Sequence, residues 1–230
     1  MLLHGLYVDS PGGAGAAMAP PMALALSASF GSVERWREEF FAMGQALGRS
    51  SGCVVLGFQP RDGTLVNQWA ADGAHMLDGS IPVLVLGMHA HADHIDFGAQ
   101  AGPCADGLMA NTDWAKVHQR YQHAVHAVGD ALGATQDDAA ETVLVDVRRA
   151  GAYEQAKSVL PGATWHDPAH VASWADGLPR DRHVVVYCVH GHEVSRVAAM
   201  QLRARGIQAH FLLGGFDGWQ AAGRPLEPKR

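Results

Sequence analysis

The chain has 230 residues, a formal net charge of -6 and 48% hydrophobic residues, which is the composition of a globular protein. This length accommodates two domains of about 100 residues each. Its charges are scattered without a basic stripe, which argues against nucleic acid as a partner. No run reaches about 18 apolar residues, so we expect no membrane helix. The three cysteines cannot all pair, and a reactive thiol persists best in a reducing compartment, so we expect a cytoplasmic protein.

The first part of the chain alternates helical and strand-like patterns. The segment 14–28 is rich in Ala, Pro and Met and is broken by Pro20-Pro21, so we expect a loop leading into a helix rather than a signal peptide. Ser32 is a candidate N-cap for a helix over 33–47. Further along, strand-like runs are expected to form a hairpin around Pro60-Arg61-Asp62-Gly63, followed by a third strand and a helix. These expected elements are 53–58, 64–69, 81–86 and 110–129.

Short motifs follow one another in a fixed order through this first part. They are Phe30-Gly31-Ser32, the helix 36–41, Asn67-Gln68, the strand 82–86, His91-Ala92, Asp96-Phe97, Asn111-Thr112-Asp113-Trp114 and Arg120-Tyr121. The series resembles the C-terminal domain of an iron/manganese superoxide dismutase. Leu3-His4-Gly5-Leu6-Tyr7 is similar to the end of that family's N-terminal hairpin. The resemblance implies a truncated α+β domain with a short antiparallel sheet at residues 1–133.

The resemblance also implies a metal site, which this chain retains only in part. Family members hold the metal with two histidines from N-terminal helices and with an Asp and a His from a turn, Asp-x-Trp-Glu-His-Ala. His91 matches the last ligand, His4 matches the second histidine, and Gln68 matches the residue that orients bound water. Gly87 stands at the aspartate position, and the first histidine has no counterpart. Without these two ligands a trivalent metal would be poorly held, so we do not expect superoxide dismutation by the family mechanism.

The same turn offers an alternative metal site. His89, His91, Asp93 and His94 form His-x-His-x-Asp-His, the spacing of two-metal centres in metallo-β-lactamase-like enzymes. At about 100° per residue, a regular helix places His89 with Asp93 and His91 with His94, so only a non-helical turn gathers all four. Binding of one Fe, Mn or Zn by His91 with His4 or His94, and a turn without any metal, are the other two alternatives.

The second part of the chain predicts a nucleophilic cysteine. Cys188 closes the apolar run 184–188 and is followed by a helical pattern at 196–205. A helix start offers N–H groups without intrahelical partners and a dipole that favours negative charge, which stabilise a thiolate or a persulfide anion. Protonated His190 and His192 would add to this effect. A buried structural cysteine is the alternative.

Motifs on both sides of Cys188 extend this prediction. They are Leu144-Val145-Asp146-Val147-Arg148, Tyr153, Leu160-Pro161-Gly162-Ala163, the Cys188 loop, the segment 213–219, Ala222-Gly223 and Pro225. The series resembles a complete single rhodanese domain at 141–230, after a polar linker at 134–140. The resemblance implies an α/β domain with a parallel sheet, and Cys188 as the catalytic residue that carries sulfur as a persulfide. It also implies a loop whose backbone amides hold that sulfur, without any cofactor.

The active loop departs from the family pattern of Cys, two residues, Gly, one residue and Arg. Gly191 is in place, but Glu193 stands where an Arg would bind the anionic part of thiosulfate. We therefore expect thiosulfate to be a poor substrate. A small-molecule or protein persulfide is the expected donor, with a thiol as the acceptor, and another anion held by His190 and His192 is the alternative. Arg196 is a candidate substitute for the missing Arg. The expected substrate-binding residues are His190, Gly191, His192, Glu193, Ser195 and Arg196.

Together these patterns predict a sulfurtransferase joined to a dismutase-like domain that has lost its usual metal binding. Residual superoxide dismutase activity, a metal-dependent persulfide-processing enzyme and a non-catalytic protein that binds oxyanions or metals are the alternatives. Because the N-terminal helices of the dismutase family are absent, we expect exposed apolar surface around Phe40, Phe41 and Trp69. A homodimer would cover it.

Overall fold

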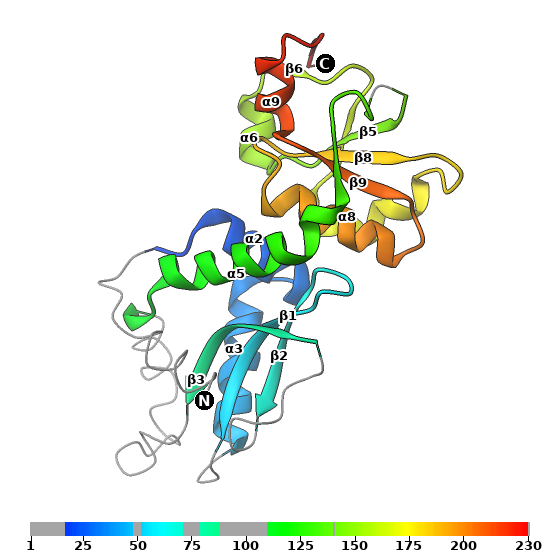
Figure 1. Ribbon diagram of the computed structural model, residues 1–230. Coiled ribbons are helices and arrows are strands. Elements are labelled where there is room, and N and C mark those ends of the chain that lie inside the picture. The colour runs from blue at the N-terminus through cyan, green and yellow to red at the C-terminus, as the bar shows by residue number, and fades with distance from the viewer. Residues whose placement is uncertain (1–16, 48–51, 71–78, 88–109, 140, 230) are drawn as a thin grey trace. The chain divides into compact units, whose positions relative to one another are not determined.

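The structure is a computed structural model that describes residues 17–47, 52–70, 79–87, 110–139 and 141–229. By its internal contacts the chain divides into two compact units. Unit 1 comprises Met1–Pro60 and Leu65–Ala124, and unit 2 comprises Arg61–Thr64 and Val125–Arg230. Figure 1 draws the helices and strands of both units.

The described part of unit 1 begins with two consecutive helices, α2 (Pro20–Phe30) and α3 (Val33–Leu47). Helix α2 covers much of the segment that we predicted as a loop, so that prediction is wrong for these residues. The reason is that Pro20 and Pro21 lie in the first turn, where a helix needs no N–H donor, and therefore start the helix rather than break it. The predicted N-cap of α3 is confirmed, because Ser32 Oγ accepts a hydrogen bond from the Arg35 N–H at 3.1 Å.

The predicted hairpin and third strand of unit 1 are confirmed as an antiparallel sheet with the order β2-β1-β3. The central strand β1 is buried along its whole length, as expected for a strand with a partner on each side. The strands are β1 (Cys53–Phe58), β2 (Leu65–Ala70) and β3 (Ile81–Gly87). Helix α5 (Trp114–Gly129) follows, and the division between the two units falls within it, after Ala124.

Aromatic side chains fill the core of unit 1. Trp36 of α3 is fully buried, and its ring centroid lies 5.4 Å from that of Phe40 and 6.0 Å from that of Trp114. Phe40 lies one helical turn after Trp36 and is 1% exposed, so it does not belong to the exposed apolar surface that we expected. Trp69 on the edge strand β2 is 52% exposed, as expected.

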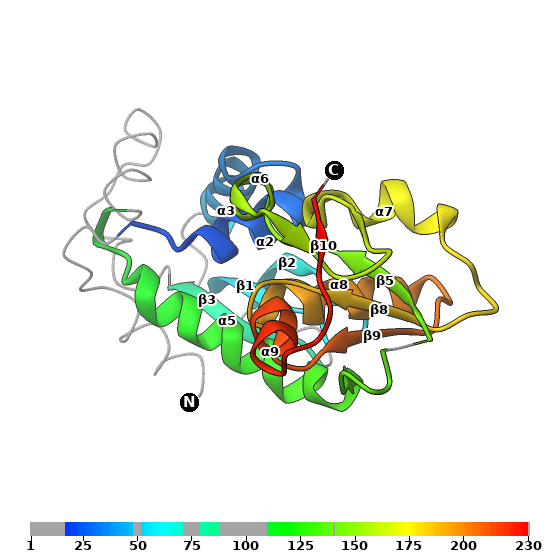
Figure 2. The same ribbon diagram turned by 90° about the horizontal axis from the view of Figure 1, so that it is seen from above.

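Unit 2 is built on a five-stranded parallel sheet with the order β4-β9-β8-β5-β7. Figure 2 shows β5, β8 and β9 beside one another in this sheet. A two-stranded antiparallel pair, β6 with β10, accompanies it. The segment predicted as a linker contributes Ala134 to β4 and the buried Ala139 to the core. The strands are β4 (Gly133–Ala134), β5 (Val143–Asp146), β6 (Ser158–Val159), β7 (Thr164–Trp165), β8 (Val184–Tyr187), β9 (Ala209–Leu212) and β10 (Glu227–Pro228).

Helices cover both faces of this sheet, as a parallel sheet with apolar strands requires. Residues of α7 and α8 pack with Val184 and Val186 on one face, whereas Trp219 of α9 packs with Val185 and Tyr187 on the other. Figure 1 shows α8 and α9 on opposite sides of β8 and β9. The helices are η2 (Asp130–Leu132), α6 (Ala150–Gln155), η3 (Pro168–His170), α7 (Val171–Trp174), η4 (Ala175–Gly177), α8 (Glu193–Ala204) and α9 (Gly215–Ala221). The predicted fold class is confirmed: a short antiparallel sheet with helices, then an α/β unit with a parallel sheet.

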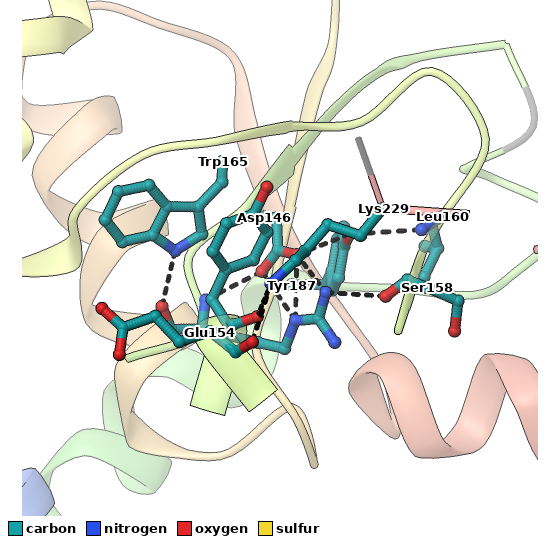
Figure 3. A network of polar contacts seen from close by, with 9 residues as sticks. Asp146, Glu154, Ser158, Leu160, Trp165, Tyr187 and Lys229 are labelled. Carbon is teal, nitrogen blue, oxygen red and sulfur yellow. Dashed lines mark hydrogen bonds and ion pairs between the residues drawn. The ribbon is translucent and has the colours of Figure 1, made fainter. Parts of the chain in front are cut away.

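A buried polar network connects the ends of β5 and β8 in unit 2 (Figure 3). The Asp146 carboxylate accepts hydrogen bonds from Arg148 Nε at 2.9 Å and from Tyr187 Oη at 3.0 Å. Tyr187 Oη in turn accepts the Leu160 N–H at 3.2 Å, and Arg148 Nη2 donates to the Ser158 carbonyl at 3.0 Å. Burial, and then the negative charge of Asp146, raise the pKa of Tyr187. The tyrosine therefore stays a neutral donor that fixes the ends of the two strands.

Among the described residues, no helix is both long enough and apolar enough to cross a membrane.

Candidate functional site

Cys188 follows directly after β8, between the neighbouring strands β5 and β9. Its side chain is 6% exposed, and its Sγ lies 3.2 Å from the hydroxyl of Ser195, which is fully buried in the first turn of α8. In open parallel sheets, ligands bind at the carboxyl ends of the strands, so Cys188 lies where this fold places its sites. A hydroxyl at this distance can donate a hydrogen bond to a thiolate.

The loop after Cys188 presents a series of backbone N–H groups. Within the described parts of the chain, the N–H groups of residues 189–192 donate to no protein oxygen. Helix α8 begins at the next residue, Glu193, and adds the positive end of its dipole. Consecutive N–H groups of this kind, followed by a helix start, are an arrangement that binds anions in proteins.

Two glycines give the loop its shape. Gly191 has φ +70°, and a Cβ on it would lie 2.6 Å from the Leu212 carbonyl oxygen. Gly215, with φ +57°, would place a Cβ 2.5 Å from the Gly191 nitrogen and 2.6 Å from the Cys188 carbonyl oxygen. Only glycine fits both positions, because any side chain would collide with backbone. The loop and the start of α9 can therefore pack directly against each other.

Histidines and carboxylates border the loop. His190 Nδ1 lies 2.9 Å from Asp217 Oδ2, and both side chains are more than half exposed. The ring centroid of His192 lies 5.4 Å from that of His190 and 6.1 Å from that of His126, in the last turn of α5. Burial, and then the charge of Arg196, lower the pKa of His126. The predicted residues His190 and His192 are thus neighbours, and His126 extends the row.

Arg196 is 8% exposed, and its guanidinium binds other groups of the protein. Its Nε and Nη2 donate to Asp130 Oδ1 at 3.1 and 2.9 Å, and its Nη1 donates to the Gly191 carbonyl oxygen. The guanidinium also lies 4.2 Å from the centroid of the Phe211 ring. This arrangement connects the active loop to α8 and η2. That Arg196 binds the substrate anion stays a prediction.

Glu193 is the first residue of α8 and is 4% exposed. A carboxylate in the first turn of a helix is stabilised by the helix dipole. Its charge also raises the pKa of His126, against the larger effects of burial and Arg196. A buried carboxyl group therefore occupies the loop position where the family pattern has an arginine.

The predicted metal ligands cannot be placed, since His4, His89, His91, Asp93 and His94 lie outside the described residues. Gln68 is described: it lies on β2, is 6% exposed, and donates from Nε2 to Ser80 Oγ at 2.8 Å. Among the residues that the structure describes, no group of three or more His, Cys, Asp or Glu side chains could hold a metal ion. This part of the chain therefore supplies no ligand set for iron or manganese.

Two carboxylates that contact the active loop residues were not predicted. Asp130 binds Arg196 from a position 66 residues earlier, and Asp217 binds His190 from the first turn of α9. Sequence spacing contains no signal for either contact, because the two partners lie in different segments of the chain.

Comparison with known proteins agrees with this geometry. Residues 130–222 match the rhodanese-like domain family. Thiosulfate sulfurtransferase GlpE of Actinobacillus succinogenes is 32% identical over 85 residues, which cover 37% of this chain and 75% of that protein. The chain belongs to the rhodanese-like family. Its rhodanese-like domain contains Cys188, the loop after it and the parallel sheet that positions both.

The part before the rhodanese-like domain is similar to superoxide dismutases. Residues 18–120 match the iron/manganese superoxide dismutase C-terminal domain family. A superoxide dismutase [Fe] of Cupriavidus metallidurans is 49% identical over 125 residues, covering 54% of this chain and 63% of that protein. A superoxide dismutase [Mn] of Halobacterium salinarum is 35% identical over 127 residues, covering 54% of this chain and 61% of that protein. The chain thus spans less than two thirds of the length of either dismutase.

Proposed function

We propose that the chain is a sulfurtransferase that carries sulfane sulfur as a persulfide on Cys188. The observation that supports this most is the position of the Cys188 thiol. It lies at the carboxyl end of β8, 3.2 Å from Ser195 Oγ, and before a series of backbone N–H groups that donate to no oxygen of the described residues. A thiolate or persulfide anion at this place accepts stronger hydrogen bonds than a neutral thiol does.

The proposed reaction has two displacement steps. The Cys188 thiolate attacks the outer sulfur of a donor, the sulfur–sulfur bond of the donor breaks, and the remainder of the donor leaves. A thiol acceptor then attacks the outer sulfur of the Cys188 persulfide and restores the Cys188 thiolate. The N–H groups of residues 189–192 would stabilise the charge of the persulfide between these steps.

Glu193 determines which donor is used in this proposal. Its buried carboxylate repels the sulfonate end of thiosulfate from the loop, whereas a persulfide with one charge or none on the transferred sulfur is repelled less. The named relative GlpE is a thiosulfate sulfurtransferase, so the proposed donor differs from that of the relative. A small-molecule or protein persulfide and a thiol acceptor are the proposed partners.

For the dismutase-like domain we propose that it does not hold iron or manganese in the family manner, because Gly87 replaces the aspartate ligand. The 49% identity to a superoxide dismutase [Fe] favours a second candidate, an iron protein with residual dismutase activity. Metal analysis of the purified protein, with a dismutase assay, separates the two. One bound iron or manganese per chain together with dismutase activity would contradict the first proposal, and metal far below one per chain would contradict the second.

We further propose that a homodimer covers the exposed Trp69 on the edge strand β2. Size-exclusion chromatography with light scattering tests this, and a clean monomer would contradict it.

The sulfurtransferase proposal is tested by transfer of sulfur from glutathione persulfide to a thiol acceptor. Cys188→Ser should abolish transfer above the rate without protein, while Cys53→Ser should retain it. Cys53 is the other described free cysteine and is buried beside the Ala70 carbonyl in unit 1, which makes it a matched control. Equal rates for the two variants would reject the proposal.

A further inference from the structure

We propose that His190, oriented by Asp217, carries the proton during sulfur transfer between thiols. This inference rests on the proposed function. The Nδ1 atom of His190 lies 2.9 Å from Asp217 Oδ2. Two acceptor atoms this close would repel each other, so beside an ionised Asp217 carboxylate Nδ1 bears the hydrogen, and in a neutral ring Nε2 is then the nitrogen that accepts a proton.

Both members of this pair are held in place relative to Cys188. The Phe216 N–H donates to the Cys188 carbonyl at 2.9 Å, and the Asp217 N–H donates to the Val189 carbonyl at 3.0 Å. The backbone of Phe216 and Asp217 is therefore fixed to the two residues that precede His190. The close contact between Gly191 and Gly215 fixes the chain on the other side of the histidine. These backbone contacts keep the residues that carry the imidazole and the carboxylate next to each other.

The His190 side chain is also accessible. It is 58% exposed and that of Asp217 is 53% exposed, whereas Cys188 is 6% exposed. Both side chains of the pair are therefore open to an acceptor thiol that approaches from solvent.

The neighbouring charged groups single out His190 among the three histidines of the row. His192 has no carboxylate within ion-pair distance among the described residues. His126 lies 3.6 Å from Asp130, beyond hydrogen-bond distance, and Asp130 is bound to Arg196. The charge of Glu193, at the start of α8, raises the pKa of His126. Of these three histidines, only His190 has a carboxylate oxygen of the described residues 2.9 Å from a ring nitrogen and lies two residues from Cys188.

The proton balance closes over one cycle. In the first step the Cys188 thiolate takes the outer sulfur of a donor persulfide, and the donor leaves as a thiolate that receives the proton of the His190 imidazolium. In the second step His190 Nε2 removes the proton of the acceptor thiol, and the acceptor thiolate takes the outer sulfur from Cys188. The sum converts donor persulfide and acceptor thiol into donor thiol and acceptor persulfide. No oxidant, reductant or further reactant is required.

The experiment compares two acceptors on protein whose Cys188 has been loaded with sulfur from glutathione persulfide. Glutathione must lose a proton before it attacks, whereas sulfite at mildly alkaline pH is already an anion without that proton. For His190→Gln we expect a loss of about 10²-fold in the transfer rate to glutathione, the lower end of general acid–base effects. The loss with sulfite should be at least tenfold smaller, which is a difference of about 1.4 kcal/mol. Asp217→Asn should show the same pattern with a smaller loss.

A matched control is His170→Gln. His170 Nδ1 lies 3.0 Å from Asp167 Oδ2, the same kind of pair on η3, outside the active loop. This variant should transfer sulfur to both acceptors at the wild-type rate. Equal losses with glutathione and sulfite in His190→Gln would assign His190 a structural or binding role and overturn the proposal, as would wild-type rates with both. A wild-type protein that gains no sulfur on Cys188 would instead reject the sulfurtransferase function itself, and this inference with it.

Discussion

Arg196 donates hydrogen bonds to both the Asp130 carboxylate and the Gly191 carbonyl, and so joins the active loop to a residue 66 positions earlier. Arg196→Ala should loosen the loop, because hydrogen bonds from a charged group contribute about 1.5 to 3 kcal/mol when buried, and less here since Asp130 is 63% exposed. We expect slower sulfur loading of Cys188 and faster amide hydrogen exchange at residues 189–192. Asp130→Asn keeps the shape of the side chain but removes its charge. It should change sulfur loading and amide hydrogen exchange in the same direction, but less. A higher KM for anionic donors with unchanged exchange would show that Arg196 binds substrate instead.

Tyr187→Phe tests the buried network shown in Figure 3. The variant leaves the Leu160 N–H without its acceptor and removes one donor from Asp146, so the free energy of unfolding should fall by about 1 to 3 kcal/mol. Urea unfolding followed by circular dichroism measures this. Tyr153→Phe is the control, because the Tyr153 hydroxyl makes no hydrogen bond within the described residues, and its effect should stay within about 0.5 kcal/mol. Equal effects of the two changes would contradict the role of the network.

Glu193→Arg should change the choice of donor. Replacing the buried carboxylate with a guanidinium turns repulsion of thiosulfate into attraction, so loading from thiosulfate relative to glutathione persulfide should rise at least about tenfold. Glu193→Gln removes the charge alone and should give a smaller rise. Stopped-flow or quenched loading assays with both donors provide the ratio. An unchanged ratio in both variants would show that Glu193 does not determine the donor.

The stability of unit 2 should fall on mild acidification. Burial is the largest cause that lowers the pKa of His126, His166 and His210 below the usual 6.5. As the pH falls below 6.5, these histidines bind protons in the unfolded chain before they do so in the folded protein. Their neutral state therefore contributes fully to the free energy of unfolding above pH 6.5, and this contribution is lost as the pH falls further. Urea unfolding between about pH 7.5 and about pH 5.5 should show this slope. His210→Gln should reduce the slope, and a stability that is constant or rises towards pH 5.5 would contradict the prediction.

Strands β1 and β2 and the start of α3 could be predicted from the sequence because their signals come from residues that are neighbours along the chain. Apolar runs and a Gly-containing turn define β1, β2 and their pairing, and Ser32 marks the start of α3. Cys188 could be placed at a strand end for the same reason, since the apolar run stops there and a helical pattern follows. The start of α2 was misjudged because Pro20 and Pro21 interrupt a helix in its interior but begin one in its first turn.

The surroundings of Cys188 could not be predicted in this way. The pairs Arg196 with Asp130 and His190 with Asp217 join distant segments, and they exist only because β4 and β8 both pair with β9 in the folded sheet. The sequence suggested Arg196 as an anion holder from its distance to Glu193 along the chain. Its hydrogen bonds to Asp130 and Gly191 depend on contacts that spacing does not contain.

The most direct test of the sulfurtransferase proposal is native mass spectrometry of the protein after incubation with glutathione persulfide and, separately, with thiosulfate. We predict a mass gain of one sulfur atom that is absent in Cys188→Ser, present in Cys53→Ser, and larger with glutathione persulfide than with thiosulfate. No gain with either donor, or a gain that survives Cys188→Ser, would contradict the proposal that Cys188 carries the sulfur.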